Sequence, residues 1–100
     1  MNEAAQASAE LTVEHDHGLH LRPAADFVRL ASRYRSEIRV TNLTRAGGRE
    51  ADGRSLLQVT ALGVNSGHRV RLTARGEDAG EAVRALSDLI RSNFGAGDHP

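Results

Sequence analysis

The residues best suited to chemistry lie near the N-terminus, in the segment Gly18-Leu19-His20-Leu21-Arg22-Pro23. A histidine can act as a nucleophile near neutral pH. An arginine offers a planar fork of donors that suits phosphoryl oxygens. Because Pro23 has a fixed φ and no N–H group, it is typical of the first turn of a helix. The spacing of His20 and Arg22 before this proline therefore predicts a histidine beside an anion-binding helix start.

A helix must follow this segment if the histidine is to work in that way. His20 would then lie at or just before the helix N-terminus, where free backbone N–H groups and the positive end of the helix dipole favour an anion, phosphate above all. The dipole also disfavours an imidazolium, so we expect a neutral ring that can take up a phosphoryl group. Apolar residues at helical spacing predict this helix over residues 23–34: Ala24, Phe27, Val28, Leu30, Ala31 and Tyr34.

The rest of the chain supplies the elements that would hold the histidine in place. Alternation of apolar and polar residues predicts strands from Leu11, over residues 36–41, near 49–51 and, most clearly, over 68–75. Outward-facing polar residues at every second position indicate an antiparallel sheet with helices on one face. We expect an α+β fold, an open-faced sandwich of four strands and three helices in the order βαββαβα.

Capping residues predict the two remaining helices. Ser55 with Gln58, and Asp78 with Glu81, fit the capping box, in which the first side chain caps the helix and the second reaches back. The helix after Asp78 should end near Asn93. The chain would thus hold one domain over residues 10–92, with a flexible N-terminal leader over 1–9 and a flexible tail over 93–100.

Composition excludes several classes of protein. Thirteen basic and thirteen acidic residues cancel among 100 residues, so net charge does not indicate a nucleic-acid-binding protein. Hydrophobic residues make up 39% of the chain without a long apolar run, which argues against membrane insertion. The absence of cysteine and of a signal-peptide pattern fits a cytoplasmic protein. No cofactor is expected.

Four segments resemble the HPr family, the histidine-containing phosphocarriers of the phosphoenolpyruvate-dependent phosphotransferase system. The resemblance runs from about residue 10 to 90 and includes the His20 motif. Leu21 departs from it, since the family has a small residue there, and the connection over residues 42–52 is a few residues longer. The other three segments are Phe27 to Val40, Arg54 to Val64 and Ala74 to Asp78.

The resemblance implies that His20 is phosphorylated on Nδ1, with phosphoenolpyruvate as the ultimate donor through enzyme I and enzyme IIA domains as acceptors. Arg22 would neutralise phosphoryl charge during transfer. The protein would relay the group without turnover of its own, as a monomer, rather than act as an enzyme. Ser55 would be a regulatory phosphorylation site for an HPr kinase/phosphorylase, although its role as a helix cap explains the serine equally well. The partner-binding face would hold Leu21, Ala25, Leu56, Leu57 and Thr60.

Other interpretations remain open. The carrier could serve a nitrogen-related branch or a dihydroxyacetone kinase instead of sugar uptake. It could also be a non-catalytic binding module of the same fold. A metal site formed by His15, Asp16, His17 and His20 is disfavoured, since a turn at Gly18 interrupts the cluster.

Overall fold

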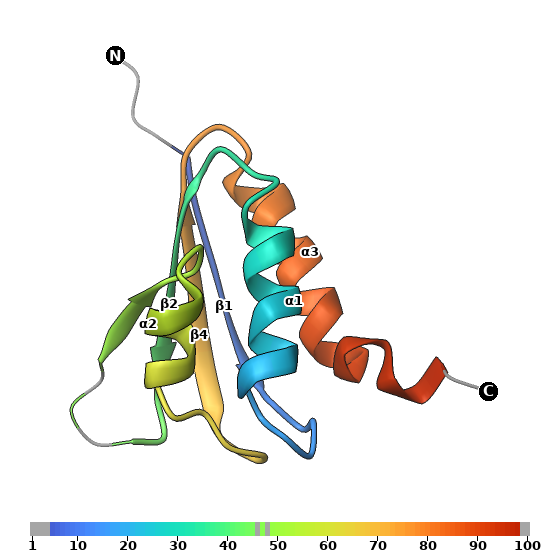
Figure 1. Ribbon diagram of the computed structural model, residues 1–100. Helices are drawn as coiled ribbons and strands as arrows, with labels where there is room; N and C mark the ends of the chain where they lie inside the picture. Colours follow the sequence, from blue (N-terminus) through green and yellow to red (C-terminus); the bar gives the residue numbers. More distant parts are fainter. Residues whose placement is uncertain (1–4, 46, 48, 99–100) are drawn as a thin grey trace.

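The computed structural model describes residues 5–45, 47 and 49–98, which form an open-faced sandwich (Figure 1). Four strands make one antiparallel sheet in the order β1-β4-β2-β3. Three α-helices lie on one face of the sheet, and α1 and α3 run side by side along it (Figure 1). The strands are β1 (Gln6–Thr12), β2 (Glu37–Asn42), β3 (Glu50–Asp52) and β4 (Arg69–Arg75), and the helices are α1 (Leu21–Ala31), α2 (Leu56–Ala61), α3 (Ala79–Arg91) and the 3₁₀ segment η1 (Asn93–Asp98). The predicted fold class is confirmed.

The core lies between the sheet and the helices, because every second strand residue faces inward. Val70, Leu72 and Ala74 of β4 are buried, whereas Arg69, Arg71 and Arg75 face the open side. Phe27 of α1 and Leu86 of α3 are also fully buried and form the helix side of the same core. Apolar residues at helical spacing thus fix which side of each helix meets the sheet.

The two ends of the domain differ from the prediction. Strand β1 begins at Gln6, which pairs with Arg75, so the leader expected over residues 1–9 is wrong for residues 6–9. This segment has little strand signal of its own, and it is a strand because it pairs with β4 along its length. Residues 1–4 lie outside the described part of the chain. At the other end, part of the tail expected over 93–100 forms η1, and Phe94 packs against the core.

One helix start and one helix cap also differ from the prediction. α1 begins at Leu21, two residues before Pro23. Asp78 occupies the N-cap position of α3, but its carboxylate makes no capping bond there and instead accepts hydrogen bonds from Arg35 and Ser36. None of the helices in the described ranges is both long and apolar enough to cross a membrane.

Candidate functional site

A tight turn sets the position of His20. Gly18 has φ of +55°, and a Cβ atom there would lie 2.1 Å from the carbonyl oxygen of Val64. Only glycine fits so close an approach with this backbone conformation. The next residue, Leu19, is fully buried and its N–H donates to the Val64 carbonyl at 2.9 Å. The turn therefore holds the chain against the loop that precedes β4 and directs His20 outward.

The start of α1 leaves backbone donors open beside His20. His20 is the N-cap residue, and its carbonyl accepts from the Ala24 N–H at 2.9 Å. Within the described part of the chain, the N–H groups of Leu21 and Arg22 have no acceptor, and Pro23 has no N–H. The first turn also lacks an acidic residue. Two free donors at the positive end of a helix dipole form a place for a phosphoryl oxygen.

The imidazole of His20 is exposed and held at one edge. Its Nε2 lies 2.9 Å from the Oδ1 atom of Asn65, which belongs to the loop between α2 and β4. Because an amide oxygen can only accept a hydrogen bond, Nε2 must carry a hydrogen. In the neutral ring the lone pair is then on Nδ1. The predicted reactive atom is therefore the nitrogen without a partner in the described structure.

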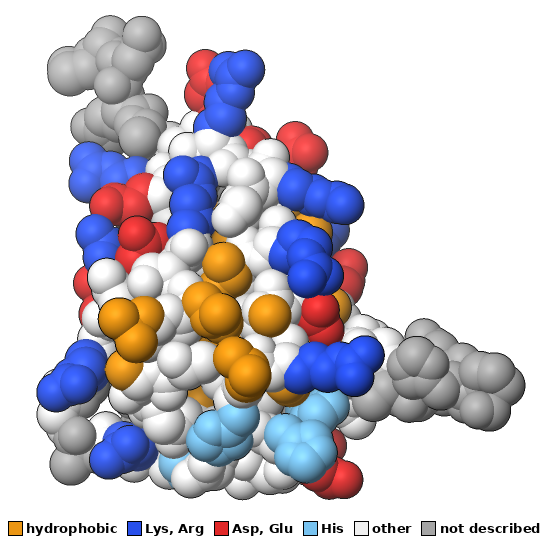
Figure 2. All heavy atoms as spheres, viewed as in Figure 1, with side chains coloured by type: hydrophobic (Ala, Val, Ile, Leu, Met, Phe, Trp, Pro, Cys, Tyr) orange, Lys and Arg blue, Asp and Glu red, His pale blue; other side chains and the backbone are white. Residues whose placement is uncertain are grey.

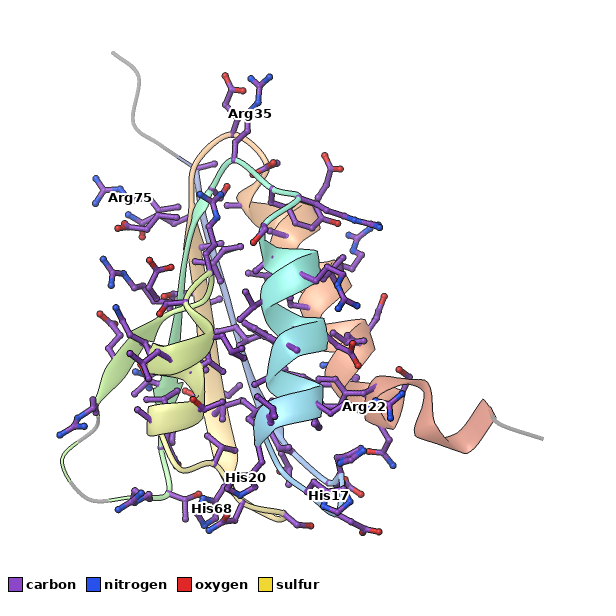
Figure 3. The ribbon with its side chains drawn as sticks, viewed as in Figure 1. His17, His20, Arg22, Arg35, His68 and Arg75 are labelled. Atoms are coloured by element: carbon purple, nitrogen blue, oxygen red, sulfur yellow. The ribbon has the colours of Figure 1, made fainter. Side chains whose placement is uncertain are left out.

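Arg22 lies at the same end of α1 but points elsewhere. Figure 3 shows its side chain directed toward η1, whereas the ring of His20 lies on the side of β4 and His68. The two side chains do share the wall of one hollow of about 700 Å³. Arg22 was expected to neutralise phosphoryl charge during transfer, and the structure directs its side chain and the ring of His20 to different sides of the helix start. A phosphoryl group on His20 would be met first by the backbone N–H groups, and Arg22 would have to swing toward it.

The far wall of this hollow comes from the C-terminal segment and was missed by the sequence analysis. Phe94 lines the hollow together with His15 and His17. Its ring meets the ring of His15 edge-on, with centroids 5.7 Å apart. Asn93 and Phe94 both have positive φ, 54° and 58°, so the chain leaves the α-helical conformation directly after α3. No periodicity in the sequence signals this change or the contact of Phe94 with His15.

Apolar side chains next to His20 form an exposed patch over α1 and α2, seen in orange above the pale-blue histidines in Figure 2. The exposed fractions are 69% for Leu21, 36% for Leu56 and 80% for Leu57, and we call these three side chains the leucine patch. Ala25 is half-buried and lies at the edge of the predicted face. Thr60 is also half-buried, and its hydroxyl donates to carbonyl groups within α2. Of the five predicted docking residues, the three leucines are therefore those most available to a partner.

Ser55 caps α2, as predicted. Its Oγ accepts a hydrogen bond from the Gln58 N–H at 3.2 Å. The second half of the expected capping box is absent, because the Gln58 side chain accepts from the Asp52 N–H instead. The serine is half-buried and adjoins the leucine patch. A phosphate on Ser55 would thus place negative charge beside Leu56 and Leu57.

The histidines before Gly18 do not converge on one point. The Nδ1 atom of His15 accepts a hydrogen bond from the backbone N–H of His17 at 3.0 Å, so this atom is occupied. Across the residues that the structure describes, no three histidine or acidic side chains are close enough to hold a metal ion together.

Comparison with known proteins identifies the family. The family model described as the PTS HPr component phosphorylation site matches residues 7–92. The chain is 50% identical over 90 residues to the multiphosphoryl transfer protein of Salmonella typhimurium, a match that covers 90% of this chain and 24% of that protein. It is 36% identical over 83 residues to phosphocarrier protein HPr of Borreliella burgdorferi, covering 83% and 92% of the two chains.

A solved structure agrees with these matches. The crystal structure of HPr-C-His from Thermoanaerobacter tengcongensis superposes with a TM-score of 0.81 at 38% identity, covering 89% of this chain and 96% of that one. The chain spans about a quarter of the length of the multiphosphoryl transfer proteins it matches. With the motif, the fold and the open helix start in agreement, the chain belongs to the HPr family of the phosphotransferase system.

Proposed function

We propose that this chain relays a phosphoryl group from phosphorylated enzyme I to enzyme IIA-type acceptors, with Nδ1 of His20 as the carrier atom. The observation that carries the proposal is an exposed imidazole whose Nε2 is engaged and whose Nδ1 is free, beside two open backbone N–H groups. Family membership supports the same role. The relay would operate in the cytoplasm as part of sugar uptake and its regulation, with the chain as a monomer.

The chemistry requires little from the carrier beyond positioning and charge. In the transfer the lone pair of Nδ1 forms a bond to phosphorus while the bond between phosphorus and the donor breaks, and the donor atom keeps that electron pair. The N–H groups of Leu21 and Arg22 would bind the phosphoryl oxygens, and the Arg22 side chain would add charge after it turns toward them. Because the site is open, the group can leave by the reverse of the same step.

The leucine patch would seat both the donor and the acceptor. Leu21 follows His20 in the chain, and Leu56 and Leu57 are exposed on α2, which packs against α1, so a partner that covers this face would also meet the reactive nitrogen. Exclusion of water from this contact would strengthen the charge interactions at His20. One face would thus serve two partners in turn, which suits a shuttle.

The central test is phosphorylation of the chain by enzyme I and phosphoenolpyruvate, followed by intact-mass measurement. We expect an acid-labile phosphoryl adduct on the native chain and none on His20→Ala. The matched control is His99→Ala, which removes a histidine with which we associate no function. An equal adduct on the native chain and His20→Ala would refute the proposal. Transfer onward to sugar-specific, nitrogen-related and dihydroxyacetone-kinase acceptors, tested one at a time, would then identify the branch.

Regulation through Ser55 needs a test of its own. An HPr kinase/phosphorylase with ATP should add one acid-stable phosphate to the native chain and none to Ser55→Ala. We expect the phosphorylated chain to accept a group from enzyme I more slowly, since negative charge beside the leucine patch would repel an acidic partner surface. If the kinase leaves Ser55 unmodified, the serine is a helix cap, worth about 1 kcal/mol.

A further inference from the structure

We propose that Asn65 is a positioning residue for phosphoryl transfer, acting by holding the Nε2–H group of His20 so that Nδ1 carries the lone pair. This inference rests on the proposed phosphocarrier function and assigns it a residue that the His20 motif does not contain. The contact joins residues 45 positions apart in the chain, at 2.9 Å. It therefore depends on how the loop before β4 is held.

Backbone hydrogen bonds fix that loop on both sides. The Val64 carbonyl accepts from Leu19, the residue before His20, at 2.9 Å. On the other side, the Gly67 N–H donates to the Val13 carbonyl at 2.7 Å, and the Val13 N–H donates to the His68 carbonyl at 2.9 Å. The turn is closed by the His68 N–H, which donates to the Asn65 carbonyl at 3.0 Å. The backbone thus places residue 65 without any contribution from its side chain, which is left for His20.

A buried asparagine and a half-buried histidine support the same turn. The Asn65 N–H donates to Nδ1 of His68 at 3.1 Å. Nδ1 of His68 also lies 3.3 Å from Nδ2 of Asn42, which is 2% exposed. Asn42 has its remaining polar groups satisfied by Leu62, Thr44 and Arg45. A fully bonded amide in the core therefore anchors His68, which in turn anchors Asn65.

The contact should become stronger as the reaction proceeds. Before transfer, Asn65 accepts a hydrogen bond from a neutral ring. When Nδ1 gives its lone pair to phosphorus, the proton stays on Nε2, so the ring becomes cationic and the bond to Asn65 becomes charge-assisted. Charge-assisted hydrogen bonds are about twice as strong as neutral ones. An interaction that strengthens along the reaction lowers its barrier.

The first test needs no partner protein. In the unphosphorylated chain at alkaline pH, ¹⁵N chemical shifts of the His20 ring report which nitrogen carries the hydrogen. We expect the Nε2–H form to dominate in the native chain. In Asn65→Ala the ratio of the two neutral forms should shift about five-fold toward Nδ1–H, the factor that corresponds to one ordinary hydrogen bond. Asn65→Asp keeps an acceptor oxygen and should favour the Nε2–H form at least as strongly as the native chain, since a carboxylate acceptor makes the bond charge-assisted.

The matched control is Ser66→Ala, an exposed neighbour in the same turn. It should leave the ring signals unchanged. His68→Phe removes the support for the turn and should shift the ratio in the same direction as Asn65→Ala. If Asn65→Ala leaves the ratio unchanged, or if the native ring carries its hydrogen on Nδ1, the inference is overturned.

The second test measures the phosphoryl equilibrium with enzyme I. At equilibrium with phosphorylated enzyme I, the ratio of phosphorylated to unphosphorylated chain should be about five-fold lower for Asn65→Ala than for the native chain. The reason is that the cationic ring loses its charge-assisted partner. Ser66→Ala should match the native chain. The two proposals fail separately: no adduct on the native chain refutes the phosphocarrier function, whereas equal adducts on the native chain and Asn65→Ala refute only the role of Asn65.

Discussion

The two ends of α1 treat their backbone donors in opposite ways. Beyond the C-terminal end, the Asp78 carboxylate accepts hydrogen bonds from the Arg35 N–H at 2.8 Å, the Ser36 N–H at 2.9 Å and the Ser36 hydroxyl at 2.5 Å. At the N-terminal end, the N–H groups of Leu21 and Arg22 have no acceptor within the described residues. The chain supplies its own anion where two loops must stay joined. At the N-terminal end it leaves the donors free, where an anion has to arrive and leave. We call the N-terminal end the open end and the Ser36–Asp78 end the closed end.

The largest expected effect comes from breaking the open end with Gly18→Ala. The added Cβ would meet the Val64 carbonyl oxygen at 2.1 Å, in a backbone conformation that already disfavours alanine. We expect a loss of about 3 kcal/mol in the free energy of unfolding, from backbone strain and overpacking together. Urea denaturation measures it. The loop that carries Asn65 should also move away from His20, which the ring ¹⁵N shifts would show.

Gly67→Ala is the matched control for this variant. Gly67 also has positive φ, +88°, but nothing lies within 4 Å of an added Cβ. Only the strain remains, so we expect a loss of about 1–2 kcal/mol. Equal losses in the two variants would mean that the approach of Gly18 to Val64 is unimportant.

The closed end should respond next most strongly, through Ser36→Ala. Ser36 is 1% exposed, and its hydroxyl donates to Asp78. Loss of this bond should cost about 1–2 kcal/mol of unfolding free energy. Phosphorylation of His20 by enzyme I should be unchanged, since the two ends are separate. Ser32→Ala is the control. This exposed serine at the C-terminal end of α1 donates only to the Val28 carbonyl, so its loss should change the free energy of unfolding by less than about 0.5 kcal/mol. A slower phosphorylation of Ser36→Ala would contradict the separation of the ends.

A titration sharpens the comparison by removing the anion of the closed end. The hydrogen bond from the Ser36 hydroxyl, followed by the one from the Arg35 backbone, lowers the pKa of Asp78 below its ordinary value. A carboxyl whose pKa is lowered in the folded state adds stability above its unfolded pKa, and this stability is lost as the pH falls through the folded pKa. The stability advantage of the native chain over Asp78→Asn should therefore be constant near neutral pH and shrink below about pH 4. Thermal unfolding of both chains across that range measures it, and an unchanging difference would count against the role of Asp78.

The smallest effect on stability is expected at the leucine patch beside the open end. Leu57 is 80% exposed, so Leu57→Ala should change the free energy of unfolding by less than about 0.5 kcal/mol. The apparent KM for enzyme I should rise several-fold, because apolar contact area is lost. Arg84→Ala, an exposed residue on α3, serves as the control and should leave both quantities unchanged. If enzyme I phosphorylates Leu57→Ala with the same apparent KM as the native chain, docking does not use this residue.

Local patterns predicted most of the framework. The alternation over residues 69–75 predicts a strand with one buried face. This strand is β4, which lies inside the sheet and pairs with both β1 and β2. The Ser55 cap and the fold class follow from equally local signals. The segment from Gln6 to Ala9 was missed because its side chains are small and polar, and its strand conformation comes from pairing with β4.

The contacts that sequence patterns could not predict are between residues far apart in the chain. Asp78 reads as a cap for α3, yet it bonds to residues 42 and 43 positions earlier. Asn65 lies 45 residues from His20 and belongs to no motif. Arg22 was expected just before a helix over residues 23–34, whereas it lies in the first turn of α1, and its side chain points toward η1. Position along a helix can be predicted from periodicity, whereas side-chain partners depend on the assembled tertiary structure.

The direction in which the two ends of the domain emerge has a practical consequence. Strand β1 starts beside Arg75, at the Ser36 end of the molecule, whereas η1 follows α3 to the side of the hollow that holds His15. An affinity tag or a biosensor surface attached ahead of β1 would leave the reactive imidazole facing the solution. The same attachment made after η1 would crowd the approach of a partner, so immobilised chains of the two kinds should differ in how readily they are charged.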